Sequence, residues 1–353
     1  MKVPELDRPA TIAQRRRDRL VPKLLLSVTA LLLVLAVGEG VYRVRALRMR
    51  RARLAGRGEA ELMTRAAPLP LGYELKPSFG EVTNSHGFRD LERTVARRPG
   101  VFRIAALGDS VTMQGALPFD QLYVSQLQRR FDAAAPGRVE LLNFGITGYN
   151  SVQEAGLLQE RVLDFDPDLV LWQFHDNDGQ HELYSASLGA FYHRPTSYLA
   201  NHVANKLDHF FCRQRARRHP DAPLGGDEAN LLCHWQRVED SFSRAVQTLA
   251  SRNIPLVVFL YPSWPLDDRW ENYGRVAVDL RARLTDYLRK RGATVIDLLP
   301  LLMQVDPAEY RVEPSDPWHP NARGHELIAD ALFRSLEPLV PGSDSVPDPE
   351  PSI

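Results

Sequence analysis

The sequence predicts an α/β fold in which a central parallel sheet is covered by helices on both faces and is preceded by a transmembrane helix. From residue 101 onward, short apolar runs alternate with helical stretches, a rhythm that implies right-handed crossovers and a parallel sheet. Near the N-terminus an uncharged apolar segment lies between two arginine clusters. The predicted strands are residues 101–107, 138–144, 168–174, 254–260 and 293–297. The predicted helices are residues 118–131, 151–165, 230–252, 270–291 and 322–339.

Two helix starts carry capping signals. Ser151 is a suitable N-cap residue, and Glu154 stands at the position that would complete a capping box. Asn321 is a plausible N-cap for the last helix.

The charge distribution separates the N-terminal part from the rest of the chain. The 353 residues are 44% hydrophobic and 25% charged, which is typical of a globular protein. Residues 1–57 contain 14 Lys/Arg and 4 Asp/Glu, a net charge of 14 − 4 = +10, so the other residues together carry −10. The basic charge is therefore local, and it does not indicate a nucleic-acid-binding surface for the whole protein.

The apolar segment predicts a single membrane span over residues 22–42. Leu24–Gly38 contains no charge, and a helix of about 20 residues covers the ~30 Å hydrocarbon core. Lys23 and Glu39 then lie near the interfaces. The main alternative is a cleaved signal peptide, but no clean Ala-x-Ala site precedes Glu39. A buried core helix is a third alternative that the flanking arginines disfavour. Arginines on both sides leave the orientation nearly undecided by charge alone.

The remaining segments precede or follow a single predicted domain. Residues 1–21 are expected to be a basic cytoplasmic N-terminus, residues 43–99 a basic stem and pre-core segment, and residues 340–353 a disordered tail. The domain spans residues 100–339 and contains an insertion at residues 179–229, which is long for a βα connection and predicts a lid or subdomain.

The insertion is rich in histidine and contains Cys212, and the second cysteine of the chain, Cys233, follows it closely. The histidine spacings match no standard metal-ligand pattern, so no metal site is predicted. Cys212 and Cys233 permit one disulfide that closes a loop of about 20 residues. Two unpaired thiols remain an equal alternative.

Polar residues follow four of the predicted strands. Because parallel strands end at the same edge of a sheet, and open α/β sheets bind ligands there, we expect these residues to lie close together. Each group taken alone is also typical of turns, helix caps or Asx turns, and the Asp–His pair is also compatible with a metal site. The candidates are Ser110, Gly148, Asn177, Asp316 and His319.

These motifs resemble the SGNH (GDSL) hydrolase family over residues 100–338. The matching blocks, in order, are Gly108-Asp109-Ser110, Asn143 to Gly148, Asn177, and Asp316-Pro317-Trp318-His319. The segment Asn84–Asp90 is similar to the one before the core in membrane-anchored bacterial members. The sequence departs from the family in the third block, where His175 and Asp176 replace two glycines. Side chains there are expected to narrow the pocket or to shift Asn177.

The resemblance implies a flavodoxin-like three-layer fold and an enzyme that cleaves acyl esters, including carbohydrate O-acetyl esters. Ser110 would be the nucleophile, His319 the base and Asp316 the residue that orients the base. The N–H groups of Ser110 and Gly148 and the amide of Asn177 would form the oxyanion hole. No metal or organic cofactor is implied.

The family resemblance and the N-terminal arginines imply a single-pass protein of the inner membrane with its catalytic domain in the periplasm. One alternative function is an O-acyltransferase that acts on envelope polysaccharide with the same triad. The other is a catalytically silent, membrane-anchored glycan-binding protein. Tyr149, Trp264 and Trp318 are expected near the pocket, although aromatic residues are more often part of a core.

Overall fold

The computed structural model describes residues 12–56, 63–180, 197–220, 224, 226–265 and 267–341. The chain divides into two compact units. One comprises Met1–Gly56 and Arg194–Asp208, and the other Arg57–His193 and His209–Ile353. The predicted terminal segments extend beyond the described residues at 1–11 and 342–353, and part of the insertion, at 181–196, 221–223 and 225, also lies outside them.

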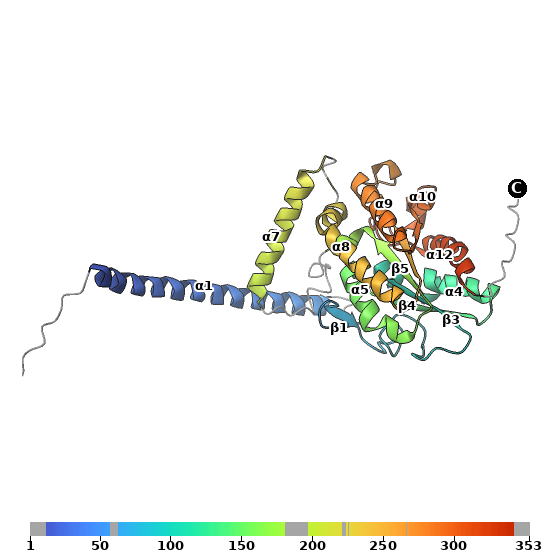
Figure 1. Cartoon of the computed structure of the whole chain (residues 1–353), viewed down its shortest axis with the longest axis horizontal. Coiled ribbons are helices and arrows are strands. Elements are labelled where there is room, and N and C mark those ends of the chain that lie inside the picture. The colour runs from blue at the N-terminus through green and yellow to red at the C-terminus, as the bar shows by residue number, and fades with distance from the viewer. Residues whose placement is uncertain are drawn as a thin grey trace, which may run out of the picture. The chain divides into compact units, whose positions relative to one another are not determined.

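The larger unit is built on a five-stranded parallel sheet with the order β4-β3-β5-β6-β7 (Figure 1). Its strands are β3 Phe102–Gly108, β4 Val139–Gly145, β5 Leu169–His175, β6 Leu256–Tyr261 and β7 Thr294–Asp297. All five predicted strands are confirmed, with ends that shift by at most two residues. The chain leaves β3 for β4 on one side and then crosses to β5 on the other. This reversal is the switch point at which open α/β sheets bind ligands.

Helices cover both faces of this sheet, so the predicted three-layer fold is confirmed. On one face pack α5 Ser151–Glu160, α8 Gly226–Ala250 and α9 Arg275–Arg289, and on the other α4 Tyr123–Ala134, α10 Leu299–Leu302 and α12 Ala322–Leu336. Side chains alternate along β3, because neighbouring residues of a strand point to opposite faces. Ala105 and Leu107 therefore belong to one hydrophobic cluster, and Ile104 and Ala106 to the other.

Three predicted helices are interrupted. The first consists of the 3-10 turn η1 Phe119–Gln121 and α4, because the intervening Leu122 is extended (φ −70°, ψ 148°). The second ends at Glu160 and continues as η2 Val162–Phe165. The third is split into η4 Trp270–Asn272 and α9.

The predicted N-cap of α5 is wrong by one residue. Asn150 caps the helix, since its side chain accepts the N–H groups of Val152 and Gln153, and Gln153 completes the capping box. Ser151 and Glu154 are instead fully buried. The predicted cap of α12 at Asn321 is confirmed by bonds from the N–H groups of Arg323 and Gly324.

Shorter elements connect these layers and the pre-core segment. An antiparallel hairpin, β1 Thr64–Ala66 and β2 Tyr73–Leu75, lies within the predicted stem. The remaining elements of the larger unit are α3 Ser110–Met113, η3 Asp176–Gly179, α11 Pro307–Tyr310 and η5 Glu337–Leu339.

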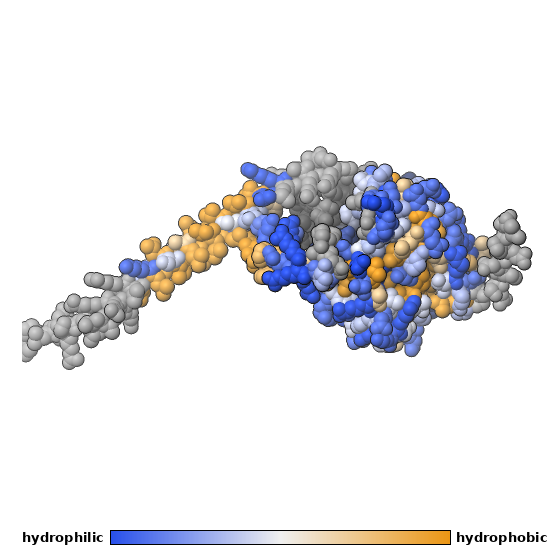
Figure 2. Space-filling view, turned by 90° about the horizontal axis from the view of Figure 1, so that it is seen from above, coloured by the Kyte–Doolittle hydropathy of each residue, from blue (hydrophilic) through white to orange (hydrophobic). Residues whose placement is uncertain are grey.

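The smaller unit contains α1, Ile12–Gly56, and the first half of α7, Tyr198–Arg217. Within α1, Val21–Arg48 is long and apolar enough to cross a membrane, and an 18-residue stretch of it has a mean hydropathy of 2.3. Its most apolar part is not buried by protein, and Figure 2 shows hydrophobic residues along this segment. A signal sequence would have the same length and composition.

Candidate active site

The nucleophile candidate stands at the end of β3, an interior strand of the sheet. A Cβ atom on Gly108 would lie 2.3 Å from Thr112 Oγ1 and 2.5 Å from Gln173 Oε1, so this position has room only for glycine. Asp109 then caps α3 by accepting the N–H of Val111 at 2.8 Å. Ser110 is the first residue of this short helix and is 8% exposed.

The loop before α12 brings a histidine to this serine. His319 Nε2 lies 2.8 Å from Ser110 Oγ, and His319 Nδ1 lies 2.7 Å from Asp316 Oδ2. Asp316 is itself held by the backbone N–H groups of Trp318 and His319, which donate to its Oδ1 at 2.9 and 3.0 Å. The structure therefore brings Ser110, His319 and Asp316 together in one line of hydrogen bonds.

The contact between Asp316 and His319 shifts the pKa of both side chains. Burial alone would lower the pKa of His319, but its hydrogen bond to Asp316 and the charge of that carboxylate outweigh this, so the pKa lies above the usual value. Burial opposes the ionisation of Asp316, but bonds from His319 and from the N–H of Trp318 outweigh it, so the pKa of Asp316 is lowered. An ionised Asp316 thus faces an imidazole of increased basicity.

Asn177 contacts the residue that precedes Ser110. Its amide Nδ2 donates to Asp109 Oδ2 at 3.1 Å, which connects η3 to the residue before Ser110. The backbone N–H of Asn177 donates to His175 Nδ1 at 3.2 Å. His175 and Asp176, the two side chains that stand where the family has glycines, are both buried. His175 contacts the Asn177 turn, whereas Asp176 pairs with Arg281.

Gly148 occupies the turn after β4. Its φ of +78° is a left-handed conformation that favours glycine. Thr147 Oγ1 contacts Met113 Sδ at 2.9 Å, so this turn lies against α3, which begins at Ser110. The turn is also held from the pre-core hairpin, because Tyr73 Oη donates to the carbonyl of Thr147 at 2.6 Å.

Of the three aromatic residues expected near the pocket, only Trp318 is exposed. Tyr149 and Trp264 are 1% and 2% exposed and belong to the core, whereas Trp318 is 38% exposed. Its ring centroid lies 6.4 Å from that of His319, and its indole N–H donates to Asp227 Oδ2 at 2.9 Å. Asp227 belongs to α8, so the insertion contributes to the surroundings of the histidine. The sequence offered no signal for this contact.

Two buried acids of the larger unit were not predicted from the sequence. Glu154 and Asp178 are 0% and 2% exposed. Glu154 Oε2 accepts the indole N–H of Trp172 at 2.6 Å, and Asp178 Oδ2 accepts the hydroxyl of Ser151 at 3.3 Å. Among the described residues, their other carboxyl oxygens have no hydrogen-bond partner. Burial, followed by the charge of neighbouring acids, raises the pKa of both carboxyl groups well above the usual value.

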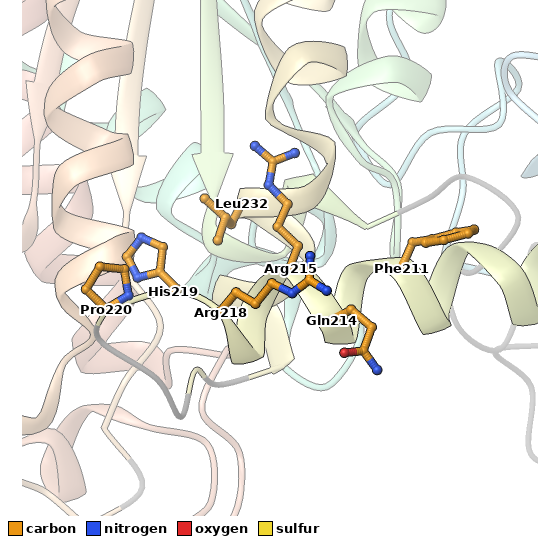
Figure 3. A pocket seen from close by; sticks show the side chains of 7 residues that line it. All are labelled: Phe211, Gln214, Arg215, Arg218, His219, Pro220 and Leu232. Carbon is orange, nitrogen blue, oxygen red and sulfur yellow. The ribbon is translucent and has the colours of Figure 1, made fainter.

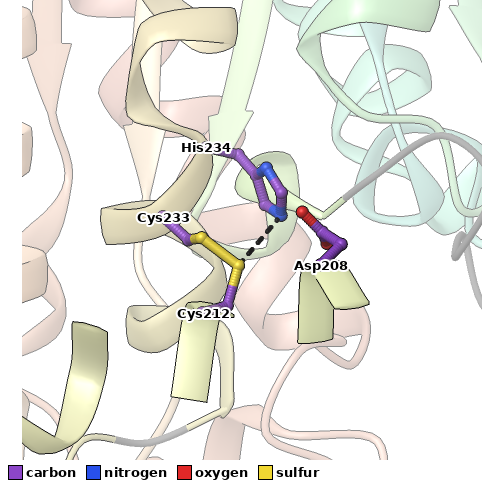
Figure 4. A group of neighbouring side chains, drawn as sticks. All are labelled: Asp208, Cys212, Cys233 and His234. Carbon is purple, nitrogen blue, oxygen red and sulfur yellow. Dashed lines mark hydrogen bonds between the residues drawn. A yellow bond between two sulfur atoms is a disulfide. The ribbon is translucent and has the colours of Figure 1, made fainter. Parts of the chain in front are cut away.

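The two cysteines do not offer thiolates to a metal. Cys212 and Cys233 are joined in a disulfide, which settles the open alternative in favour of the bond (Figure 4). His234 Nε2 lies 3.6 Å from Cys212 Sγ.

A sequence model of the GDSL-like Lipase/Acylhydrolase family matches residues 106–327. The fold is similar to the acetylxylan esterase Axe2 of Geobacillus stearothermophilus, with 16% identity, a TM-score of 0.46, and coverage of 67% of this chain and 95% of that one. The psychrotrophic esterase EstA of Pseudoalteromonas sp. is 18% identical, with a TM-score of 0.40 and coverage of 67% of this chain and 97% of that one. A search of curated proteins finds no match.

The matched region begins in β3, ends in α12, and contains every candidate residue of the site. It covers more than half of the chain. The chain therefore belongs to the GDSL-like lipase/acylhydrolase family and is an enzyme that cleaves ester bonds.

Proposed function

We propose that Ser110, His319 and Asp316 form a catalytic triad that hydrolyses carboxylic esters through an acyl-enzyme. The observation that carries this proposal is the line of contacts from Ser110 Oγ to His319 Nε2, 2.8 Å, and from His319 Nδ1 to Asp316 Oδ2, 2.7 Å. A serine hydroxyl is a weak nucleophile at neutral pH and needs an adjacent base. His319 takes the proton as Ser110 attacks the ester carbonyl, and Asp316 stabilises the imidazolium that forms.

The oxyanion is proposed to bind the N–H groups of Ser110 and Gly148 and the amide of Asn177. The first N–H groups of a helix lack intrahelical acceptors, which leaves that of Ser110 available. One such donor typically contributes ~3 kcal/mol to transition-state stabilisation. His319 then returns its proton to the departing alcohol, and water, activated by the same histidine, releases the acid from Ser110.

Trp318 supports esters of sugars as the substrate class. Because His319 protonates the leaving alcohol, the alcohol lies on the histidine side of the nucleophile, where Trp318 is exposed. Pockets for small molecules commonly combine aromatic surfaces with a few polar groups, and here Asp227 and Gln180 adjoin the indole. Asp227 accepts from Trp318 at 2.9 Å and from Gln180 at 3.3 Å.

The test combines labelling with kinetics. A fluorophosphonate should label the wild-type chain and the control Ser251→Ala, in which an exposed serine is removed, but not Ser110→Ala. Trp318→Ala should lower kcat/KM for acetylated xylosides far more than for 4-nitrophenyl acetate, and Trp318→Phe should restore part of it. Labelling that persists in Ser110→Ala contradicts the triad. Adding a polyol acceptor to the assay measures acyl transfer against hydrolysis.

We also propose that α1 anchors the enzyme in a membrane, with the catalytic domain outside the cytoplasm. The support is the apolar segment Val21–Arg48 and the arginines that precede it. The full chain should resist extraction by alkaline carbonate, and a reporter fused after residue 338 should be active in the periplasm. A reporter that is active only in the cytoplasm contradicts the orientation.

A further inference from the structure

Helix α7 exposes large apolar side chains on one side. Val203, Leu207, Phe210 and Phe211 are 47%, 51%, 54% and 63% exposed. Their spacing of i, i+4, i+7 and i+8 places all four on one face of the helix. We call these four residues the α7 stripe. A soluble helix normally turns such a face toward the protein core, so the stripe needs a different partner.

The end of the same helix is basic. Arg213, Arg215, Arg217 and Arg218 are all exposed and follow the stripe within two turns. Arg215 and Arg218 line a hollow of about 440 Å³ beside Phe211 and Leu232 (Figure 3). Among the described residues that line it, none is acidic. The exposed side of α7 thus passes from apolar to positively charged.

The opposite side of the helix is held by protein. Cys212 and Ala216 are 4% and 8% exposed and lie about half a turn from the centre of the stripe. The disulfide from Cys212 to Cys233 joins this side to α8 (Figure 4). The disulfide therefore fixes which side of the second half of α7 packs against α8.

The first turn of α7 is tied to Glu39 of α1. Glu39 accepts the backbone N–H groups of Tyr198 and Leu199 at 3.1 and 2.9 Å and the hydroxyl of Ser197 at 2.8 Å. A carboxylate at a helix N-terminus is stabilised by the unpaired N–H groups there. This contact explains why an acidic residue directly follows the uncharged run Leu24–Gly38.

Two contacts of aromatic rings strengthen this junction between α1 and α7. The rings of Tyr42 and His202 stack at 4.4 Å, and Arg43 lies 5.3 Å from the centre of the Tyr198 ring. Glu39, Tyr42 and Arg43 lie just after the uncharged run Leu24–Gly38. If α1 spans a membrane, as proposed above, α7 begins at the boundary of the bilayer.

We propose that the α7 stripe and the four arginines dock on the surface of the membrane that α1 spans, and that the lipids they bind are anionic phospholipids. The apolar side chains enter the boundary between headgroups and acyl chains, as in other interfacial helices. The arginines extend to the phosphate groups. A second copy of the chain is the alternative partner, which the test below distinguishes.

The test uses the full chain in nanodiscs with p-benzoylphenylalanine in place of Phe211. The discs contain either phosphatidylcholine alone or an equimolar mixture with phosphatidylglycerol. After irradiation, mass spectrometry of the labelled peptide should show lipid adducts, and more of them in the anionic discs. The same probe in place of His209, which is exposed on the other half of the helix, should give few adducts.

Charge variants then test the arginines. Arg217→Gln/Arg218→Gln should weaken docking by about fivefold for each arginine, so that the adduct yield at position 211 falls. The matched control Arg252→Gln/Arg275→Gln removes two exposed arginines of the catalytic domain and should leave the yield unchanged. Hydrolysis of 4-nitrophenyl acetate by each variant reports whether the domain is folded.

Three outcomes would overturn the inference. One is equal adduct yield at positions 211 and 209, and another is equal yield in the two kinds of disc. The third is a cross-link to a second chain, which would assign the stripe to a protein interface. This inference rests on the proposed anchoring by α1. Extraction of the wild-type chain by alkaline carbonate would refute the anchor itself, a result distinct from an anchored chain that gives no adduct at position 211.

Discussion

His319 Nε2 lies 2.8 Å from Ser110 Oγ although 209 positions separate the two residues in the chain. The sheet creates this contact. Ser110 follows the interior strand β3, and the loop that carries His319 follows the edge strand β7. This loop is fixed where Val312 N–H donates to the His319 carbonyl at 3.1 Å. The interaction is therefore a property of the folded sheet edge.

Replacing Ser110 or His319 by Ala should lower kcat by about 10⁴-fold or more, because the hydroxyl and the base act as a unit. The double variant should lose little beyond either single variant. Steady-state kinetics on a 4-nitrophenyl ester measures all three rates. If the losses in the two single variants multiply in the double variant, the residues act independently and the triad is wrong.

Asn177→Ala should lower kcat by about 10²–10³-fold, less than the loss of the nucleophile, because it removes one oxyanion donor. Asn177 also donates to Asp109 at 3.1 Å, so the substitution removes a structural contact as well. Asn177→Asp is the matched control: it keeps the size of the side chain but replaces the donor with an acceptor. Its activity should be no higher than that of the Ala variant, and equal activity to wild type would contradict the oxyanion role.

The parallel sheet and the proximity of Ser110 to His319 were predictable because both depend on where the strands of one sheet end, whereas the catalytic roles of these residues stay predictions. Apolar runs that end in Gly or in polar residues mark strands, and Ser110, Asn177 and His319 each follow one. The cap of α5 was misassigned because Asn150 and Ser151 are both good N-cap residues, and the burial of Ser151 against Asp178 decides between them. The contacts of Trp318 with Asp227 and of Glu39 with the start of α7 join segments distant in sequence, where no local pattern exists.

Activity should rise with pH through a pKa above the usual histidine value of about 6.5. Asp316 raises the pKa of His319, and an imidazolium cannot accept the proton of Ser110. Asp316→Asn removes the negative charge that raises the pKa of His319. The burial of the imidazole, which lowers this pKa, remains, so the pKa of His319 should fall. NMR titration of histidine-labelled protein measures both values. An unchanged or higher pKa in the variant would show that Asp316 does not set the basicity of His319.

Removing the disulfide should destabilise the larger unit. Cys212 and Cys233 are 21 positions apart, and a bond across such a loop contributes ~3 kcal/mol in the chain-entropy model. Cys212→Ser/Cys233→Ser should therefore unfold at a lower temperature than wild type under oxidising conditions. A reductant should lower the unfolding temperature of wild type toward that of the variant and leave the variant unaffected. A reductant effect on the variant would point to another cause.

The two neighbouring acids of η3 should respond in opposite ways to the same substitution. Asp176 is paired with Arg281 at 3.2 Å and accepts the hydroxyl of Tyr273 at 2.6 Å. Burial opposes its ionisation, but Arg281 outweighs this and the pKa of Asp176 is lowered. Asp176→Asn breaks a buried ion pair and should cost about 3 kcal/mol. This cost lies at the lower end of the range for broken buried ion pairs, because Arg281 still pairs with Asp297 at 2.7 Å.

Asp178 and Glu154 should instead tolerate replacement by the amide, because a buried carboxyl with a raised pKa keeps its proton and an amide has a similar shape. The folded protein holds these protons while the unfolded chain releases them, so the free energy of unfolding falls as pH rises above the usual carboxyl pKa values. Glu154→Gln/Asp178→Asn should remove this decline and make the variant the more stable protein at mildly alkaline pH. Denaturation at several pH values measures the difference. A variant that is less stable than wild type at every pH, as expected for Asp176→Asn, would mean that the two acids are ionised in the folded protein.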